Sequence, residues 1–319
     1  MRDDTVYTYT LILTHDADRL SLRAFPLFSK SALSIFKRGL WINLRRLVEG
    51  EISVLNYFDS ILWCLFYPLV RFGLVDDPWE KAVYDIVDLE RKYGARSTFF
   101  FIPFPDSCGR IAEGMPAPVD RGVRYDLRKY GHLLRYLESQ GWEAGVHGID
   151  AHISAMDAKA ELDAIKRILA GKEKIGIRMH WLYKTDKLHQ NLREAGFYYD
   201  ATGETDGSAI NQSSLGPHKE KGLWRLPLDI QDGSILSFWE KNFSRETALE
   251  VIYKKMQKAK GEGGAVTVLF HTDVLRFPFY WKDIYEAILR RAALDCARMI
   301  SCVEYCLEKD EGINGGDFK

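Results

Sequence analysis

Apolar, β-rich segments alternate with amphipathic helical segments along most of this chain, and this alternation restricts the fold more than any other feature. Short runs of β-branched and aromatic residues predict strands at residues 7–14, 97–103, 142–147, 176–181, 197–202, 223–230 and 265–271. Helical periodicity predicts helices at residues 78–93, 127–140, 156–169, 185–195, 245–260 and 280–307. Such alternation indicates a parallel sheet, and 319 residues suffice for a distorted (β/α) barrel. Because neither a repeat nor a linker occurs, we expect one α/β domain over residues 1–319, with residues 20–77 as a helical insertion after the first strand.

The composition argues against several classes of protein. The 44 Lys and Arg side chains nearly balance the 45 Asp and Glu side chains, which gives no support for nucleic-acid binding. The five cysteines form no Cys-x-x-Cys pair, and Cys302 and Cys306 fall in a predicted helix, so we expect reduced thiols. The N-terminus lacks the apolar segment of a signal peptide. We therefore expect a soluble, cytoplasmic protein.

One hydrophobic segment, residues 53–75, tests that expectation. Its longest uninterrupted apolar run, residues 61–70, contains Pro68 and is ten residues long. A membrane span needs about twenty residues, so this run is too short to cross a bilayer. Basic side chains such as Arg38 and Arg45 precede it, which leaves peripheral contact with the inner face of the membrane open. The alternative is a helical cap over the active-site end of the barrel.

Five predicted strands end in Asp, His or Arg side chains. These ends read THDAD (14–18), HGIDAH (147–152), RMHW (178–181), DIQD (229–232) and HTD (271–273), and they hold five of the eight histidines. In β/α barrels the reactive groups lie at the C-terminal ends of the strands. The concentration of ionisable side chains at these ends therefore predicts an active site.

Two pairs of residues at these ends have the spacing of a metal site. Asp16 and Asp18 project from one face of an extended strand, so one carboxylate can bind a cation while the other acts as a base. His147 and His152 lie five apart across a predicted loop, which can bring both to one ion. With Asp18 they form the nitrogen and oxygen donor set of catalytic Zn²⁺, so we expect a divalent metal there. The alternatives are an Asx-type turn at the aspartates and hydrogen-bonded structural histidines.

Seven segments carry a resemblance to a known family. They are LTHDAD (13–18), RSTFFFIP (96–103), WEAGVHGIDAH (142–152), IRMHW (177–181), LREAGFYYDAT (192–202), LPLDIQDGS (226–234) and LFHTD (269–273). In this order they resemble the polysaccharide deacetylases, a carbohydrate esterase family, and most closely its intracellular branch with a T-H-D-x-D first motif. The resemblance covers nearly everything except residues 20–77 and the tail. It implies a distorted (β/α) barrel whose divalent metal is held by one Asp and two His.

The resemblance also implies a role for each matching residue. Asp18 matches the metal-binding Asp, and His147 matches the first metal-binding His. The catalytic matches are Asp16 (the general base), Arg178 (which orients the base), His271 (the general acid) and Asp232 (which supports His271). These roles together imply that a water deprotonated by Asp16 attacks an acetamide carbonyl, while His271 protonates the departing amine. The implied substrate is an N-acetylated sugar or glycoconjugate.

Departures from the family pattern leave the third metal ligand open. The family's second motif spaces its histidines four apart, whereas His147 and His152 are five apart, and Gly148 stands where the family has Ser or Thr. The family's third motif ends in Pro-Tyr where this chain has His180 and Trp181. The third ligand is therefore His152, His180 or neither. A neighbouring aromatic ring, that of Trp181 or of Tyr183, either stacks on a sugar or belongs to the core.

Three functions fit this pattern. The leading hypothesis is a metal-dependent deacetylase of an N-acetylated sugar or its conjugate. The first alternative is a hydrolase of another C–N or amide bond, because a fold does not fix its substrate. The second is a catalytically silent relative that binds a glycan or a membrane through residues 20–77. Asp16 and His271 argue against silence, because a pure binding protein needs neither a base nor an acid.

Overall fold

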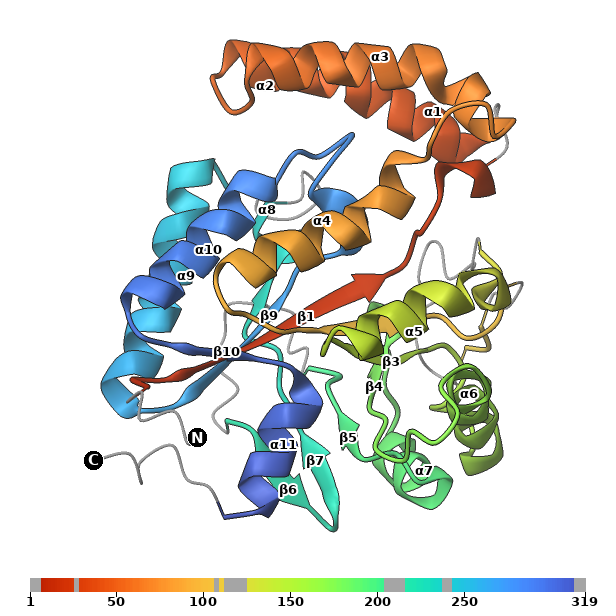
Figure 1. The fold of residues 1–319 in the computed structure, drawn as a ribbon, viewed down its shortest axis with the longest axis vertical. Helices are drawn as coiled ribbons and strands as arrows, with labels where there is room; N and C mark the ends of the chain where they lie inside the picture. Colours follow the sequence, from red (N-terminus) through yellow and green to blue (C-terminus); the bar gives the residue numbers. More distant parts are fainter. Residues whose placement is uncertain are drawn as a thin grey trace.

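A mixed sheet of ten strands forms the centre of the protein. The computed structural model describes residues 7–25, 29–105, 109–111, 125–203, 216–236 and 243–312. The strands are β1 (Thr10–Ala17), β2 (Thr98–Phe101), β3 (Glu143–Gly148), β4 (Ile177–Met179), β5 (Tyr199–Asp200), β6 (His218–Glu220), β7 (Leu223–Arg225), β8 (Ile230–Gln231), β9 (Ala265–Leu269) and β10 (Arg298–Ile300). Their order is β6-β7-β5-β4-β3-β2-β1-β9-β8, with β10 beside the start of β1, and every pair except β6–β7 is parallel. The path is an open half-barrel (Figure 1). The predicted α/β fold of distorted (β/α)-barrel type is confirmed.

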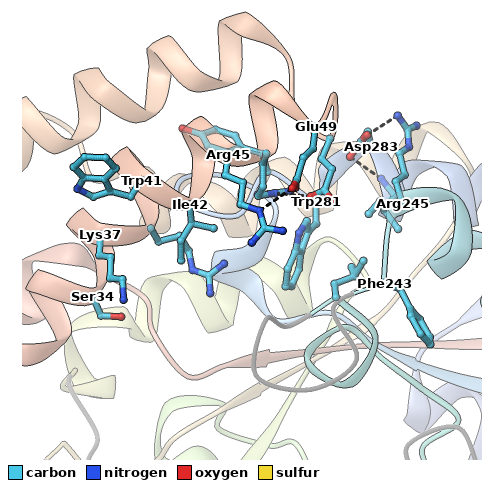
Figure 2. A pocket seen from close by; sticks show the side chains of 16 residues that line it. Ser34, Lys37, Trp41, Ile42, Arg45, Glu49, Phe243, Arg245, Trp281 and Asp283 are labelled. Carbon is cyan, nitrogen blue, oxygen red and sulfur yellow. Dashed lines mark hydrogen bonds and ion pairs between the residues drawn. The ribbon is translucent and has the colours of Figure 1, made fainter.

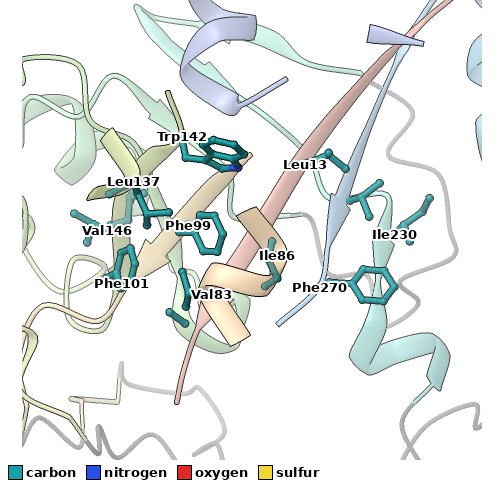
Figure 3. Packing of buried hydrophobic residues seen from close by; sticks show 14 of the residues in the cluster. Leu13, Val83, Ile86, Phe99, Phe101, Leu137, Trp142, Val146, Ile230 and Phe270 are labelled. Carbon is teal, nitrogen blue, oxygen red and sulfur yellow. The ribbon is translucent and has the colours of Figure 1, made fainter. Parts of the chain in front are cut away.

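Helices pack around this sheet and bury its apolar side chains. They are α4 (Pro78–Lys92), α5 (Gly131–Ser139), α6 (Ala155–Ile168), α7 (Leu188–Ala195), α8 (Asp232–Leu236), α9 (Arg245–Glu262), α10 (Lys282–Leu294) and α11 (Cys302–Asp310). Helix α4 begins where the sequence predicts, with Pro78 in its first turn and the Asp77 side chain accepting from the Trp79 N–H. Figure 3 shows Val83 and Ile86 of α4 packed beside Leu13 and Phe99 of the sheet. Burial of these side chains fixes the strands whose ends carry the ionisable groups.

Two predicted elements differ from the structure, each at an identifiable residue. The prediction of one strand over residues 223–230 is wrong, because Pro227 lacks the N–H that a continuous ladder needs and the chain forms β7 and β8 instead. The prediction of one helix over residues 280–307 is also wrong. Cys296 adopts a left-handed conformation with φ 53°, which ends the helical path, and the chain continues as β10 and α11. Tertiary pairing of β10 with the start of β1 stabilises this interruption.

Helices that follow β1 form a separate layer, here named the helical lobe and defined as residues 30–74. It contains α1 (Lys30–Lys37), a π-helical turn (Arg38–Ile42), α2 (Asn43–Val48) and α3 (Val54–Arg71). Figure 1 places the lobe at one end of the molecule, beyond the C-terminal end of β1. Among the described residues, no helix combines the length and the apolar character needed to cross a membrane.

The lobe is attached to the loop that follows β9. The Asn43 amide donates to the Pro278 carbonyl at 2.9 Å, and Arg46 donates to the Phe279 carbonyl at 2.7 Å. The Tyr280 hydroxyl donates to Asp59 of α3 at 2.8 Å. Because this loop begins next to His271, the lobe and the candidate site share one supporting segment.

Candidate metal centre and active site

Three potential metal ligands meet at the C-terminal ends of neighbouring strands. Asp18 follows β1, His147 lies near the end of β3, and His180 follows β4. One ligand atom from each lies within 4.8 Å of the others, and among the described residues this is the group of His, Cys, Asp or Glu side chains able to hold an ion. Parallel pairing of β3 with β4 places His147 opposite Arg178, which brings His180 to the same edge.

The hydrogen bonds around His147 show that this group fits a cation. Its Nδ1 lies 2.9 Å from the Arg178 carbonyl oxygen and must donate there, so Nε2 carries a lone pair in the neutral ring. That Nε2 lies 2.9 Å from Asp18 Oδ1 and 3.0 Å from His180 Nδ1. Asp18 Oδ1 is buried, and no donor reaches it in hydrogen-bonding geometry. One carboxylate oxygen and two ring nitrogens thus converge on one point, which is the donor set that a Zn²⁺-type ion takes once the rings release their protons.

The charges of the group favour an ionised Asp18. Burial by itself would raise the pKa of this carboxyl, but the positive charge of His180 and the contacts from His147 and His180 hold its pKa well below the ordinary value. A carboxylate that stays ionised throughout the neutral range is a competent metal ligand.

The structure brings His180, and not His152, to Asp18 and His147. His152 is buried, and its ring lies edge-on to Tyr183 with 4.8 Å between the ring centroids. The loop after β3 takes another course because Glu161 of α6 accepts the N–H groups of Ile149 and Asp150 at 2.9 and 2.6 Å. Of the two candidates for the third ligand, the structure therefore groups His180, and not His152, with Asp18 and His147.

A carboxylate and a buried guanidinium stand on one side of the metal group. Arg178 is fully buried, and its Nη1 donates to Asp16 Oδ1 at 3.0 Å and to the Thr14 hydroxyl at 2.8 Å. The Arg178 Nε donates to the Ala201 carbonyl, and the guanidinium lies over the Phe100 ring. Asp16 Oδ2 lies 3.9 Å from His147 Nε2, so its second oxygen faces the metal group. A carboxylate held in this position can serve as a base at the edge of the group.

A histidine and a carboxylate stand on the other side. The His271 Nδ1 donates to Asp232 Oδ1 at 2.8 Å, and the His271 N–H donates to Asp232 Oδ2 at 2.7 Å. The Nε2 atom faces the site, 3.7 Å from Asp18 Oδ2. Burial disfavours the charged ring, but Asp232 beside it raises the pKa of His271 well above its ordinary value, with smaller effects from Asp18 and Asp16. A protonated Nε2 near neutral pH is what a general acid needs.

Two supporting residues were missed by the sequence analysis. The Tyr125 hydroxyl donates to the Ala17 carbonyl and accepts from the Ile102 N–H, each at 2.7 Å, so it joins the ends of β1 and β2 beside Asp16 and Asp18. Asp273 binds Arg19 at 3.2 Å, and burial raises its pKa. The HTD segment contains Asp273 and was a usable signal, whereas no motif marks Tyr125.

His15 belongs to a different cluster, although it lies in the first motif. It points to the opposite face of β1, where its Nδ1 contacts the Phe270 carbonyl and its Nε2 contacts Glu90, both at 2.8 Å. The Glu90 carboxylate also accepts from Ser97, Trp142 and Tyr285, and the whole cluster is buried. The polar groups of this cluster form hydrogen bonds with one another and with the backbone, which indicates a structural role.

The two candidate stacking aromatics have different surroundings. Trp181 is 54% exposed and follows His180 directly, whereas Tyr183 is 6% exposed and packs against His152. Trp181 and Leu182 both adopt left-handed conformations, with φ 59° and 50°. Strained backbone of this kind costs energy and gathers at functional sites. Trp181 is therefore the aromatic surface available beside the metal group.

A cavity of about 250 Å³ lies between the helical lobe and the body of the protein (Figure 2). Basic and aromatic side chains dominate its lining, among them Lys37, Arg38, Trp41, Arg45, Arg46, Phe243, Arg245 and Trp281. Neither Asp18 nor His271 lines it. The cavity is thus a separate feature from the metal centre.

Comparison with known proteins identifies the fold. No family profile and no curated protein matches the chain. A Mycobacterium smegmatis structure assigned to the polysaccharide deacetylases has a TM-score of 0.58 at 14% identity, covering 98% of this chain and 93% of that chain. A Pseudomonas aeruginosa PAO1 structure with the same assignment has a TM-score of 0.54 at 13% identity, covering 97% and 93%. The Puue allantoinase has a TM-score of 0.56 at 12% identity, covering 98% and 92%.

The resemblance found in the motifs therefore holds for the fold. The chain has the fold of the polysaccharide deacetylases over nearly its whole length. At these identities the similarity establishes the fold, and the chemistry has to be argued from the site.

Proposed function

We propose that this protein is a divalent-metal-dependent hydrolase that removes an N-acetyl group from a sugar or glycoconjugate. One observation carries the proposal. The group formed by Asp18, His147 and His180 lies between a carboxylate held by Arg178 and a histidine held by Asp232. A metal-ligand set, a base and an acid are the parts that amide hydrolysis needs.

Asp18, His147 and His180 would hold the ion, and Zn²⁺ matches their donor atoms. When bound, such an ion acts as a Lewis acid toward water and the amide carbonyl. The Arg178 carbonyl keeps the His147 Nε2 unprotonated by accepting from Nδ1. The protein thereby keeps one ligand nitrogen ready in the required tautomer.

Asp16 and His271 divide the proton transfers between them. The Arg178 guanidinium holds Asp16 through Oδ1, and the Oδ2 of Asp16 takes a proton from the attacking water. Asp232 fixes the tautomer of His271, so Nε2 delivers a proton to the departing amine. Because the two groups face the centre from different strand ends, neither has to move between the two steps.

Trp181 is the proposed contact for the sugar. Its exposed ring stands directly after His180, and aromatic rings pack well against the apolar faces of sugars. Such stacking would orient the acetamide toward the centre without entering the chemistry.

The same geometry would serve another amide or C–N bond. An allantoinase shares this fold, so the fold does not decide between the two substrate classes. A cytoplasmic location also stays a prediction from the sequence.

Acetate release from N-acetylated sugars, nucleotide-sugars and lipid-linked sugars tests the substrate class. Zinc-loaded wild type should release acetate from at least one of them. If it releases none, but opens cyclic or linear amides, the alternative hydrolase replaces the deacetylase. If a zinc-loaded protein hydrolyses neither panel, the chain is a silent relative.

A matched pair of histidine variants tests the ligand set. His180→Ala should lose bound zinc, measured by elemental analysis, whereas His152→Ala should retain it. The opposite result would restore the ligand set that the motif spacing suggests.

A further inference from the structure

The helical lobe exposes far more apolar surface than the rest of the protein. Among the described residues, nineteen large apolar side chains are exposed, and fourteen of them lie between Leu33 and Leu74. Val48 is 81% exposed, Leu55 79% and Trp41 72%. Single exposed apolar residues are ordinary, but a concentration on one element marks an interaction surface.

Helix α3 arranges this surface as a continuous face. Its exposed positions recur at helical spacing along one side, at Leu55, Phe58, Leu62, Leu65, Phe66 and Leu69. The opposite side, with Cys64, Tyr67 and Val70, packs into the lobe. Figure 1 shows α3 along the outer edge of the lobe, away from the sheet. Eighteen residues at about 1.5 Å per residue make this face roughly 27 Å long.

The charged side chains of α3 do not interrupt its outer apolar face. The charged residues of the helix are Asp59 and Arg71. Asp59 accepts a hydrogen bond from Tyr280 and so belongs to the inner side, while Arg71 ends the helix. A helix with one apolar face and a basic end, too polar overall to span a bilayer, is suited to lie in its interface.

The lobe also carries unmatched positive charge. It has six Lys and Arg residues against three Asp and Glu residues, in a chain whose overall formal charge is −1. Within the described part of the chain, Arg45 pairs with Glu49 and Arg46 pairs with Glu51, so the lobe's glutamates are used internally. Arg38 lies over the Phe279 ring, and it lines the cavity between the lobe and the body together with Lys37. Of the lobe's six cations, Lys30 and Arg71 lie outside these pairs and outside the cavity lining.

We propose that the helical lobe docks on the surface of an anionic phospholipid bilayer, with the outer face of α3 in the interface and the cations at the end of the lobe, Lys30 and Arg71, against the headgroups. Anionic lipid supplies the negative charge that the lobe lacks. A second copy of the chain, bound through the same face, would instead bring two sets of unmatched cations together. Because β1 runs from the sheet toward the lobe, docking would hold the metal centre near the bilayer (Figure 1).

Vesicle co-sedimentation of the full chain tests this docking independently of any activity. Phosphatidylcholine vesicles containing phosphatidylglycerol should pellet the protein, and vesicles of phosphatidylcholine alone should pellet much less. Phe58→Glu combined with Leu65→Glu should abolish binding, because two charges would enter the apolar face. Leu294→Glu on α10, at a position that is 77% exposed, is the matched control and should bind like wild type.

Removing two cations should weaken binding by a calculable factor. Each basic side chain near an anionic surface contributes about 1 kcal/mol, so Lys30→Gln with Arg71→Gln should reduce binding about 30-fold. Absence of binding to both kinds of vesicle would overturn the proposal. A concentration-dependent dimer in sedimentation equilibrium that Phe58→Glu dissociates would assign the face to a second copy instead.

Discussion

Two buried ionisable clusters lie on opposite faces of β1, and they differ in how their hydrogen bonds are satisfied. On one face, Glu90 accepts from His15, Ser97, Trp142 and Tyr285. On the other face, one ligand atom from each of Asp18, His147 and His180 lies within 4.8 Å of the others, and Asp18 Oδ1 has no hydrogen-bond partner. The first cluster is complete as a folded protein, whereas the second is incomplete: Asp18 Oδ1 accepts no hydrogen bond there, and the group could hold a cation. Buried charge by itself therefore does not mark a functional site; the missing partner does.

The largest effect is expected where the incomplete cluster loses its carboxylate. Asp18→Asn removes the charged ligand, so bound zinc and all activity should be lost. Zinc at about a hundredfold over its Kd should stabilise wild type by about 2.7 kcal/mol and leave the variant unchanged, as thermal unfolding with and without zinc would show. Zinc-dependent stabilisation of the variant would contradict the assignment of Asp18.

Next in size are the proton-transfer groups beside that cluster. Asp16→Asn and His271→Ala should each lower kcat about 10²- to 10⁴-fold, with a much smaller change in KM, because each acts in the transition state. Steady-state acetate release with measured zinc content is the assay. His132→Ala, at an exposed histidine, is the control. Equal turnover after Asp16→Asn would remove Asp16 from the mechanism.

A substitution in the complete cluster around Glu90 should lower the stability of the protein and leave its metal content unchanged. Glu90→Gln leaves donors without their shared acceptor, so the free energy of unfolding should fall by about 3 kcal/mol while zinc stays bound. Urea unfolding measures this loss, with exposed Glu250→Gln as the control. A Glu90→Gln protein that is stable but has lost zinc would break the distinction between the two faces.

The same cluster predicts a pH dependence of stability. Burial would raise the pKa of Glu90, but the hydrogen bond and charge of His15 hold it below the ordinary 4.5. A carboxyl whose pKa is lower in the folded state than in the unfolded state stabilises the protein at pH values above its unfolded-state pKa. This stabilisation is lost as the pH falls through the folded-state pKa. The stability gap between wild type and Glu90→Gln should therefore narrow below about pH 4.5. If the difference in the free energy of unfolding between the two proteins widens in acid, the lowered pKa assigned to Glu90 is wrong.

The smallest effect is expected at the rim of the incomplete cluster. Trp181→Ala should raise KM about three- to tenfold and leave kcat and zinc content nearly unchanged, since ring stacking contributes about 0.5–1.5 kcal/mol. Trp181→Phe should recover part of the loss. A fall in kcat with unchanged KM would show that Trp181 acts on the chemistry through His180.

Features that depend on local pattern could be predicted from the amino-acid sequence. Strand and helix periodicity predicted the β/α architecture, and the ionisable residues at the ends of β1, β3, β4 and β9 predicted where the candidate site lies. The pairing of Arg178 with Asp16 and of Asp232 with His271, expected from the resemblance, is seen as hydrogen bonds. These outcomes follow because the pleat alternates side chains and parallel strands end at one edge.

The histidine that joins Asp18 and His147 is set by contacts that form when the chain folds. Sequence spacing favours His152, but Glu161 draws the loop after β3 aside, and the register of β3 against β4 delivers His180. His15 and Asp16 point to opposite faces of β1. Glu90 of α4 contacts His15 on one face, so His15 becomes part of a structural cluster, whereas Asp16 faces the metal group. Contacts between residues far apart in the chain settle these choices, and the spacing of neighbours along a sequence carries no record of them.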